Sequence, residues 1–165
     1  MQSMDKFKNT IQLYSKLGKK YLDDIEGFYI KEFNNFIKIL PPKAKVLDVG
    51  CAGGRDSNYF LKKGFDYTGI DLVDLFLAEA RKKYPRGKFL KMDMRELDFP
   101  DNSFDGIWAH GVLLHLEKED IPTVLQKMYN TLKPGGKVHI GVKKGAGTSK
   151  VKDKLSQGKE RTFTY

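Results

Sequence analysis

The stretch VLDVGCAGGRD, residues 46–56, decides the fold of this 165-residue chain. Pro41 and Pro42 come shortly before it, and the apolar run KVLDV (45–49) leads into a turn that holds three glycines. A short apolar run bounded by proline and glycine is typical of a strand that is buried on both faces. Because glycine carries no side chain, the turn that follows can bring the backbone close to a ligand.

Outward from this strand, further strands and helices alternate. The sequence predicts strands at 45–49, 66–71, 88–92, 104–109 and 137–142, and helices at 56–63, 74–84 and 118–132. Apolar strands that alternate with amphipathic helices are typical of a mainly parallel sheet covered on both faces. Right-handed crossovers then favour an α/β, doubly wound, Rossmann-like fold.

The chain length predicts one domain with three parts. Residues 1–45 are expected to form a helical lid and a packing helix, residues 46–145 a cofactor-binding core, and residues 146–165 a basic, mobile tail. A helix is expected over 26–40, where apolar side chains recur at helical spacing: Phe28, Phe33, Phe36, Ile37 and Leu40. Tyr14 and Tyr21 lie seven residues apart, on one helix face, where they either pack in the core or cover a ligand.

Composition excludes several classes of protein. No apolar run reaches the ~20 residues that span a bilayer, and the first ten residues do not form a secretory signal. One cysteine and three histidines, without a cluster, predict no internal disulfide and no metal site, so a cytoplasmic location is expected.

The net charge of +9 is carried by the two ends of the chain. Residues 1–45 hold nine basic and five acidic side chains, residues 143–165 hold seven and two, and residues 46–142 hold fourteen of each. This distribution favours a basic helix and a solvated tail over a nucleic-acid-binding face.

Two residues of the turn after the first strand differ from the glycine pattern of dinucleotide-binding proteins, and this difference indicates what kind of ligand the turn binds. Aligned on Gly50, the chain reads G-C-A-G-G-R, so Ala52 and Arg55 stand where the pattern G-x-G-x-x-G needs its second and third glycines. A pyrophosphate site is therefore disfavoured, and a nicotinamide oxidoreductase with it. Asp48, just before the turn, would repel a pyrophosphate and suits a ligand that carries an ammonium and a sulfonium.

Other polar residues follow the ends of the neighbouring strands, where ligands of parallel sheets bind. Asp71 lies 21 residues after Gly50, the spacing at which an acidic residue accepts hydrogen bonds from a ribose. Asp93 ends the third predicted strand, where it could accept from an adenine amino group, and His110 follows the fourth. Any one of these aspartates could instead be a helix cap or a loop residue. Their shared position at one rim favours a common ligand site.

Five motifs in this order and spacing resemble the class I S-adenosylmethionine-dependent methyltransferases. They are VLDVGCAGG (46–54), GIDL (69–72), MDMREL (92–97), FDGIWAHGVLLHL (104–116) and LKPGGKVHIGVKKG (132–145). Within that family the chain is most similar to small methyltransferase-domain proteins related to tellurite-resistance methylases, from about Tyr14 to Tyr165. The resemblance implies S-adenosyl-L-methionine as cofactor and a small-molecule methyl acceptor.

The resemblance also implies roles for individual residues. The first motif lies under the methionine part of the cofactor, Asp71 binds the ribose, Leu72 packs on the adenine, and Tyr14 and Tyr21 cover the site. The remaining implied positions are Asp48, Gly50, Ala52 and Gly54 for the first motif, Asp93 and Met94 for the adenine edge, and Ala109 and His110 for the methionine end.

Methyl transfer needs an acid or base only where the acceptor holds its proton. His110 and His115 are the catalytic candidates, and each could instead be a packing or loop residue. His139 is expected to be a core or edge residue.

The chain departs from the pattern of the family after RTFTY (161–165), where relatives continue into a helix and an antiparallel pair of strands. The fifth strand is therefore expected to be an exposed sheet edge, so that either the chain is truncated or the tail or a partner chain, such as a second copy in a homodimer, covers it. Two other functions stay open: a cofactor-binding but inactive module, and an RNA methyltransferase, which the basic ends would suit.

Overall fold

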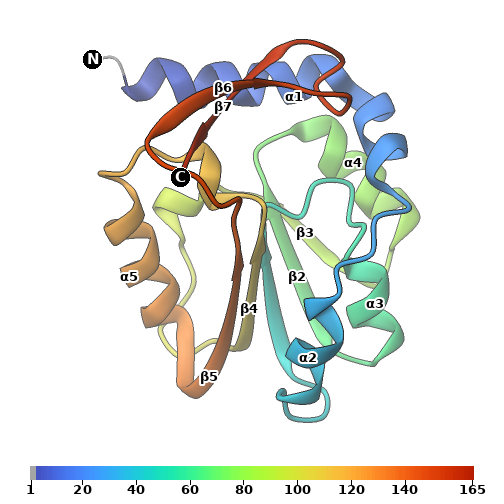
Figure 1. Cartoon of the computed structure of the whole chain (residues 1–165). Helices are drawn as coiled ribbons and strands as arrows, with labels where there is room; N and C mark the ends of the chain where they lie inside the picture. Colours follow the sequence, from blue (N-terminus) through green and yellow to red (C-terminus); the bar gives the residue numbers. More distant parts are fainter. Residues whose placement is uncertain (1–2) are drawn as a thin grey trace.

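The computed structural model describes residues 3–165, so residues 1 and 2 of the predicted N-terminal part lie outside the described chain. Its centre is a five-stranded sheet in the order β3-β2-β1-β4-β5, in which every pairing is parallel (Figure 1). The strands are β1 (Lys45–Val49), β2 (Asp66–Asp71), β3 (Lys88–Lys91), β4 (Phe104–His110) and β5 (Leu132–Gly141). The predicted Rossmann-like α/β fold is confirmed, and its strand order reverses between β1 and β4.

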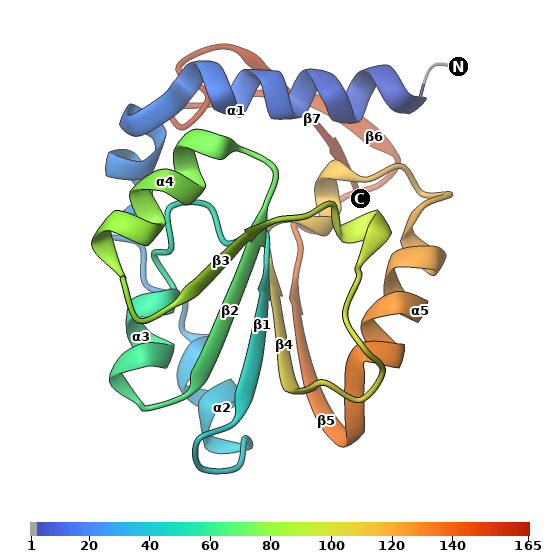
Figure 2. The ribbon, with the colours of Figure 1, turned by 180° about the vertical axis from the view of Figure 1, so that it is seen from behind.

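Helices cover both faces of the sheet because its strands carry apolar side chains on both faces (Figure 2). On one face, Val46 and Trp108 pack against α2 (Glu32–Lys38), α3 (Ser57–Lys62) and α4 (Asp74–Lys83). On the other face, Leu47 and Ile107 pack against α5 (Ile121–Thr131). Two short 3-10 helices, η1 (Met94–Glu96) and η2 (Leu113–His115), follow the ends of β3 and β4.

The first helix, α1 (Ser3–Ile25), lies across the carboxyl ends of the strands (Figures 1 and 2). It breaks at Gly18, whose φ of 57° and ψ of −143° are accessible mainly to glycine. Tyr14 and Leu17 pack on Val73 and Phe76 at the start of α4. The helix is therefore fixed above the rim where the sequence places a ligand. None of the helices within residues 3–165 has the length and apolar character to cross a membrane.

The helix predicted over 26–40 is shorter than expected, because α2 begins only at Glu32. Phe33, Phe36 and Leu40 are buried as predicted, whereas Phe28 lies outside the helix and is 50% exposed. Gly27, a poor helix former, lies in the segment that stays non-helical.

Pro134, Gly135 and Gly136 form an irregularity of the β-ladder inside β5. Phe104 pairs with Leu132 and Gly106 pairs with Lys137, so the register shifts across these residues. Gly135 adopts a φ of 79°, which glycine reaches without steric cost.

The segment 146–165, predicted as a mobile tail, instead contains an antiparallel hairpin. Its strands are β6 (Thr148–Lys152) and β7 (Glu160–Thr164), and it lies beside α1 and packs on η2 (Figure 1). The prediction failed because it rested on the polar composition of this segment, whereas packing against other elements buries Arg161 and Phe163. The hairpin forms its own sheet, so the alternative in which the tail covers β5 is wrong. β5 is an edge strand, and Val138 and Ile140 in it, with Val142 just after it, are exposed.

Candidate active site

A cavity of about 330 Å³ lies beneath α1, above the carboxyl ends of β1, β2 and β4. The structure brings ten of the predicted site residues to its wall: Tyr14, Tyr21, Asp48, Gly50, Ala52, Asp71, Leu72, Met94, His110 and His115. It does not bring Gly54, Asp93 or Ala109 to the wall. The cavity therefore lies at the predicted rim, with α1 as its roof.

The turn of residues 50–54, called the Gly50 turn below, is held by backbone hydrogen bonds. The N–H groups of Gly50 and Cys51 both donate to the carbonyl of Ile70, at 2.9 and 3.0 Å. Gly50 has a φ of 78°, and a Cβ atom there would lie 2.5 Å from Cγ2 of Val112. Ala52 also has a positive φ, 46°, a conformation that alanine adopts at some cost. The alanine thus occupies a glycine-like backbone position.

Asp71 connects this turn to the end of β2. Its Oδ2 accepts the N–H of Ala52 at 2.9 Å, and its Oδ1 accepts the N–H groups of Leu72 and Val73 at 2.8 and 2.9 Å. Burial raises the pKa of the carboxyl, and these three bonds oppose that rise. Since a carboxylate offers about four acceptor positions, about one position is left for a ligand hydroxyl.

Asp93 is engaged elsewhere. Its carboxylate accepts hydrogen bonds from Nε and Nη2 of Arg95, at 3.1 and 2.6 Å to Oδ2, and from the backbone N–H of Arg95 at 2.9 Å. It thereby caps η1, while its neighbour Met94 lines the cavity. The role of Asp93 in binding adenine stays a prediction. Ala109 is fully buried in the core beside the cavity.

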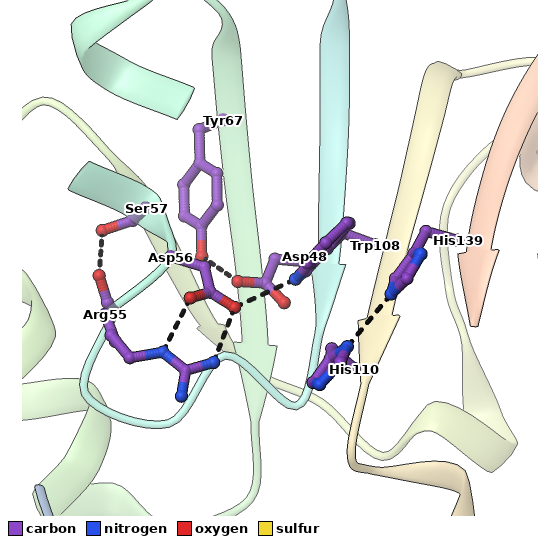
Figure 3. A network of polar contacts seen from close by, with 9 residues as sticks. Asp48, Arg55, Asp56, Ser57, Tyr67, Trp108, His110 and His139 are labelled. Carbon is purple, nitrogen blue, oxygen red and sulfur yellow. Dashed lines mark hydrogen bonds and ion pairs between the residues drawn. The ribbon is translucent and has the colours of Figure 1, made fainter. Parts of the chain in front are cut away.

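Two buried carboxylates, Asp48 and Asp56, flank the Gly50 turn (Figure 3). The hydroxyl of Tyr67 donates to Oδ2 of Asp48 at 2.6 Å, and Nε1 of Trp108 donates to Oδ2 of Asp56 at 2.9 Å. Arg55 makes a bidentate ion pair with Asp56, in which Nε donates to Oδ1 at 2.7 Å and Nη2 donates to Oδ2 at 3.0 Å. Burial, followed by the charge of Asp56, raises the pKa of Asp48 well above its usual range. Sequence reasoning missed Asp56 because its position fits the start of a helix and gives no other signal.

A second set of polar side chains is centred on Tyr14, in the part of α1 before Gly18. It is called the Tyr14 cluster and consists of Tyr14, His115, Asp153 and Arg161. The Tyr14 hydroxyl is 3.1 Å from Nε2 of His115, and Nη1 of Arg161 donates to the same hydroxyl at 3.1 Å. Nη2 of Arg161 pairs with Asp153. Sequence reasoning missed Arg161 and Asp153, because both lie in the segment whose composition predicts a tail.

Burial keeps the Tyr14–His115 pair uncharged. Burial, reinforced by the positive charge of Arg161, lowers the pKa of His115 to about 3. Burial raises the pKa of Tyr14, and Arg161 opposes this rise. At neutral pH the structure therefore holds a neutral imidazole against a neutral phenol.

His110 also lines the cavity. Its Nδ1 is 3.0 Å from Nε2 of His139, and the His139 ring stacks on Trp108 with a centroid distance of 3.9 Å. Burial lowers the pKa of both histidines. His139, predicted as a core or edge residue, is partly buried on the edge strand β5.

Residues 46–136 match the model of a family described as "Methyltransferase domain". The chain is 38% identical over 117 residues to phosphoethanolamine N-methyltransferase 3 of Arabidopsis thaliana, covering 67% of this chain and 23% of that protein. It is 34% identical over 102 residues to the putative methyltransferase YqeM of Bacillus subtilis, covering 59% of this chain and 41% of that protein. The chain thus spans less than half the length of these curated relatives.

Among solved structures, the chain is similar to a TehB-like SAM-dependent methyltransferase from Corynebacterium glutamicum. The TM-score is 0.61 at 25% identity, and the match covers 80% of this chain and 70% of that one.

Proposed function

Because the chain belongs to the methyltransferase-domain family, we propose that it transfers a methyl group from S-adenosylmethionine to a small molecule. The match to the family model confirms the family that the sequence resembles, and S-adenosylmethionine is the cofactor of this family. The activity is inferred from one observation: the Gly50 turn, Asp71 and the Tyr14–His115 pair border the same cavity.

The cavity wall fits the parts of the cofactor. Asp48, whose carboxyl a bound ammonium would help to ionise, and the positively charged Arg55 would hold the ammonium and the carboxylate of the cofactor, and Asp71 keeps about one acceptor position for a ribose hydroxyl. Leu72 and Met94 offer apolar surface for a flat aromatic base. Gly50 keeps the wall open where a side chain would collide with Val112.

When bound, S-adenosylmethionine supplies a methyl group that is already activated by its sulfonium. The protein's own contribution is therefore to orient the acceptor and to exclude water. Tyr14 and Tyr21 of α1 form the roof that would do so. Their rings meet edge to face with centroids 4.9 Å apart, and Tyr21 stacks on Phe76.

The Tyr14 cluster suits an acceptor that arrives with a free lone pair. Since Tyr14 and His115 are both uncharged at neutral pH, they orient an acceptor by hydrogen bonds and are weak proton acceptors. We propose a small amine as acceptor, which would react in its unprotonated form after giving its ammonium proton to solvent. The name of one relative states that it acts on phosphoethanolamine, and Lys143 borders the cavity, where its positive charge would favour an acceptor that also carries an anionic group.

Binding and turnover test the proposal separately. S-adenosylmethionine and S-adenosylhomocysteine are expected to raise the melting temperature of the purified chain, because a ligand of the folded state stabilises it. Transfer of radiolabelled methyl groups to a panel of small amines, with and without phosphate, is then expected to identify acceptors. Cofactor binding without any transfer would support the inactive-module alternative, and no shift at millimolar cofactor would exclude both.

A further inference from the structure

We propose that His110 and His139 form a relay that carries the proton of the amine acceptor from the cavity to solvent at the edge of the sheet. This role rests on the proposed methyl transfer, because an amine has to lose its ammonium proton before its nitrogen can attack a methyl group. His115 is a poor acceptor of this proton, since burial lowers its pKa to about 3. His110 borders the same cavity and is hydrogen-bonded to a second histidine.

The hydrogen bond between the two rings is aligned for proton transfer (Figure 3). Nδ1 of His110 lies 3.0 Å from Nε2 of His139, and the planes of the two rings differ by only 6°. The ring centroids are 5.3 Å apart, which is the largest separation that two imidazoles with this nitrogen–nitrogen distance can reach. The rings therefore lie end to end in one plane, where the N–H of one ring points at the lone pair of the other.

Each ring of the pair also has a second nitrogen that is available. Within residues 3–165, His110 Nε2 and His139 Nδ1 have no hydrogen-bond partner, and neither atom is sealed from solvent. His110 borders the cavity, whereas His139 is partly exposed on the edge strand β5. The pair thus connects the cavity with the outer edge of the sheet.

The sequences of β4 and β5 provide the space and the support for this arrangement. His110 is the ladder partner of Gly141, and a Cβ atom added to Gly141 would collide with Nδ1 of His110. Glycine at this position lets the His110 ring cross β5 and reach His139. The His139 ring in turn stacks on Trp108, whose Nε1 donates to Asp56 at 2.9 Å. Both rings are therefore held in line.

The proton transfers balance when His110 donates to His139 at the start. The N–H bond of the ammonium breaks, its electron pair stays on the amine nitrogen, and His110 Nε2 takes the proton. The hydrogen on His110 Nδ1 then moves to His139 Nε2, and His139 Nδ1 gives its own hydrogen to water. Because both outer nitrogens reach water, the pair returns to its first arrangement after the product leaves, so either direction of the bond in the resting protein serves the relay.

The surroundings keep the pair uncharged at neutral pH, so that it has a lone pair to offer. Burial lowers the pKa of both histidines. The negative charges of Asp56 and Glu32 oppose this shift on both rings, while Arg55 adds to it on His110 and the His110 ring adds to it on His139. As the pH falls through the pKa of the pair, the rings become protonated and the relay stops.

Turnover of an amine acceptor as a function of pH tests the relay. His139→Phe keeps a ring on Trp108 but has no nitrogen to take the proton from His110. Its kcat at pH 7 is expected to fall about tenfold or more, at the lower end of the scale of acid–base catalysis, while the affinity for S-adenosylhomocysteine changes less than about threefold. This loss is expected to shrink as the pH rises toward the pKa of the amine, because the free amine then enters without a proton to lose.

Chemical rescue gives the second readout. His139→Ala leaves the space of the ring open, so added imidazole is expected to restore part of its kcat. His139→Phe fills that space, so imidazole is expected to leave its kcat unchanged. Val138→Thr, at the neighbouring exposed position of β5, is the matched control and is expected to behave like the wild type. If His139→Phe does not fold, the response of His139→Ala to pH and imidazole decides the question.

The geometry can be measured without turnover. Nitrogen NMR of the full chain with labelled histidine is expected to show a coupling between His110 Nδ1 and His139 Nε2 across their hydrogen bond. The absence of this coupling in the wild type would overturn the relay.

The outcomes separate this inference from the proposed function. No turnover on any amine would overturn the proposed function, and the relay with it. If amines are methylated but His139→Phe has the kcat and pH profile of the wild type, the relay alone is wrong. The relay is also wrong if the loss in His139→Phe is equal at every pH and imidazole does not rescue His139→Ala, because His139 would then act through packing.

Discussion

The two ends of the cavity are assembled from very different distances along the sequence. The Gly50 turn and Asp71 lie within one strand–helix–strand unit, and the bond from Ala52 to Asp71 joins residues 19 apart. In the Tyr14 cluster, the bonds from Tyr14 join it to residues 101 and 147 positions away. The first end is therefore determined by local backbone geometry, and the second by how α1, η2 and β7 pack. This difference predicts which substitutions act through the backbone and which act through side chains.

The largest effect is expected at the backbone of the Gly50 turn. Gly50→Ala places a Cβ atom 2.5 Å from Val112 at a φ of 78°. The collision and the strained φ together are expected to cost about 2–5 kcal/mol of unfolding free energy and to abolish cofactor binding. Gly64→Ala is the matched control, because Gly64 has a φ of 79° and the Cβ that alanine would add there meets nothing within 4 Å. Urea denaturation measures both, and equal losses would mean that Val112 yields easily.

The next largest effect is expected from the carboxylate that supports this turn. Asp71→Asn exchanges one acceptor oxygen for a donor that faces backbone N–H groups, so affinity for S-adenosylhomocysteine is expected to fall by about 2–3 kcal/mol. Asp93→Asn is the comparison, because the structure engages Asp93 with Arg95 away from the cavity wall. Calorimetry should detect a much smaller loss for it. An equal or greater loss in Asp93→Asn would restore the adenine-binding role predicted from the sequence.

These two aspartates show how far the sequence alone reaches. Strand positions and the spacing of Asp71 follow from local patterns, and the structure places Asp71 at the cavity. Asp93 has the same local pattern, but the side chain of Arg95, two residues later, takes its carboxylate. Arg161 could not be identified at all, because its partner Tyr14 is at the other end of the chain. The hairpin was missed for a related reason: Phe163 is buried only through packing on other elements.

The two ends are also expected to respond to pH in opposite directions. The pKa of His115 is lowered to about 3, so its contribution to stability is present above the unfolded value of about 6.5 and is lost as the pH falls. The pKa of Asp48 is raised, so its contribution is present below the unfolded value of about 3.9 and is lost as the pH rises. Each contribution is expected to be on the order of 1–2 kcal/mol.

Thermal unfolding measured across pH 4–8 tests whether His115 and Asp48 change the stability of the fold in opposite directions with pH. His115→Gln is expected to flatten the loss of stability on the acid side, and Asp48→Asn the loss toward higher pH. If both variants changed the same side of the profile, the two ends would not be the separate electrostatic units that their burial indicates.

The smallest effect is expected on the outer face of the hairpin, where an exposed ion pair can be compared with the buried pair of Arg161 and Asp153. Lys150 and Glu160 form an ion pair at 3.0 Å, with side chains 70% and 44% exposed. Exposed pairs contribute about 0–1 kcal/mol, so Lys150→Gln is expected to shift the melting temperature by little and to leave cofactor affinity unchanged. Asp153→Asn removes the charge partner of the buried Arg161 in the same hairpin and is expected to lower the unfolding free energy by more. Equal effects of the two variants on the unfolding free energy would mean that the buried pair of Arg161 and Asp153 stabilises the fold no more than the exposed pair of Lys150 and Glu160.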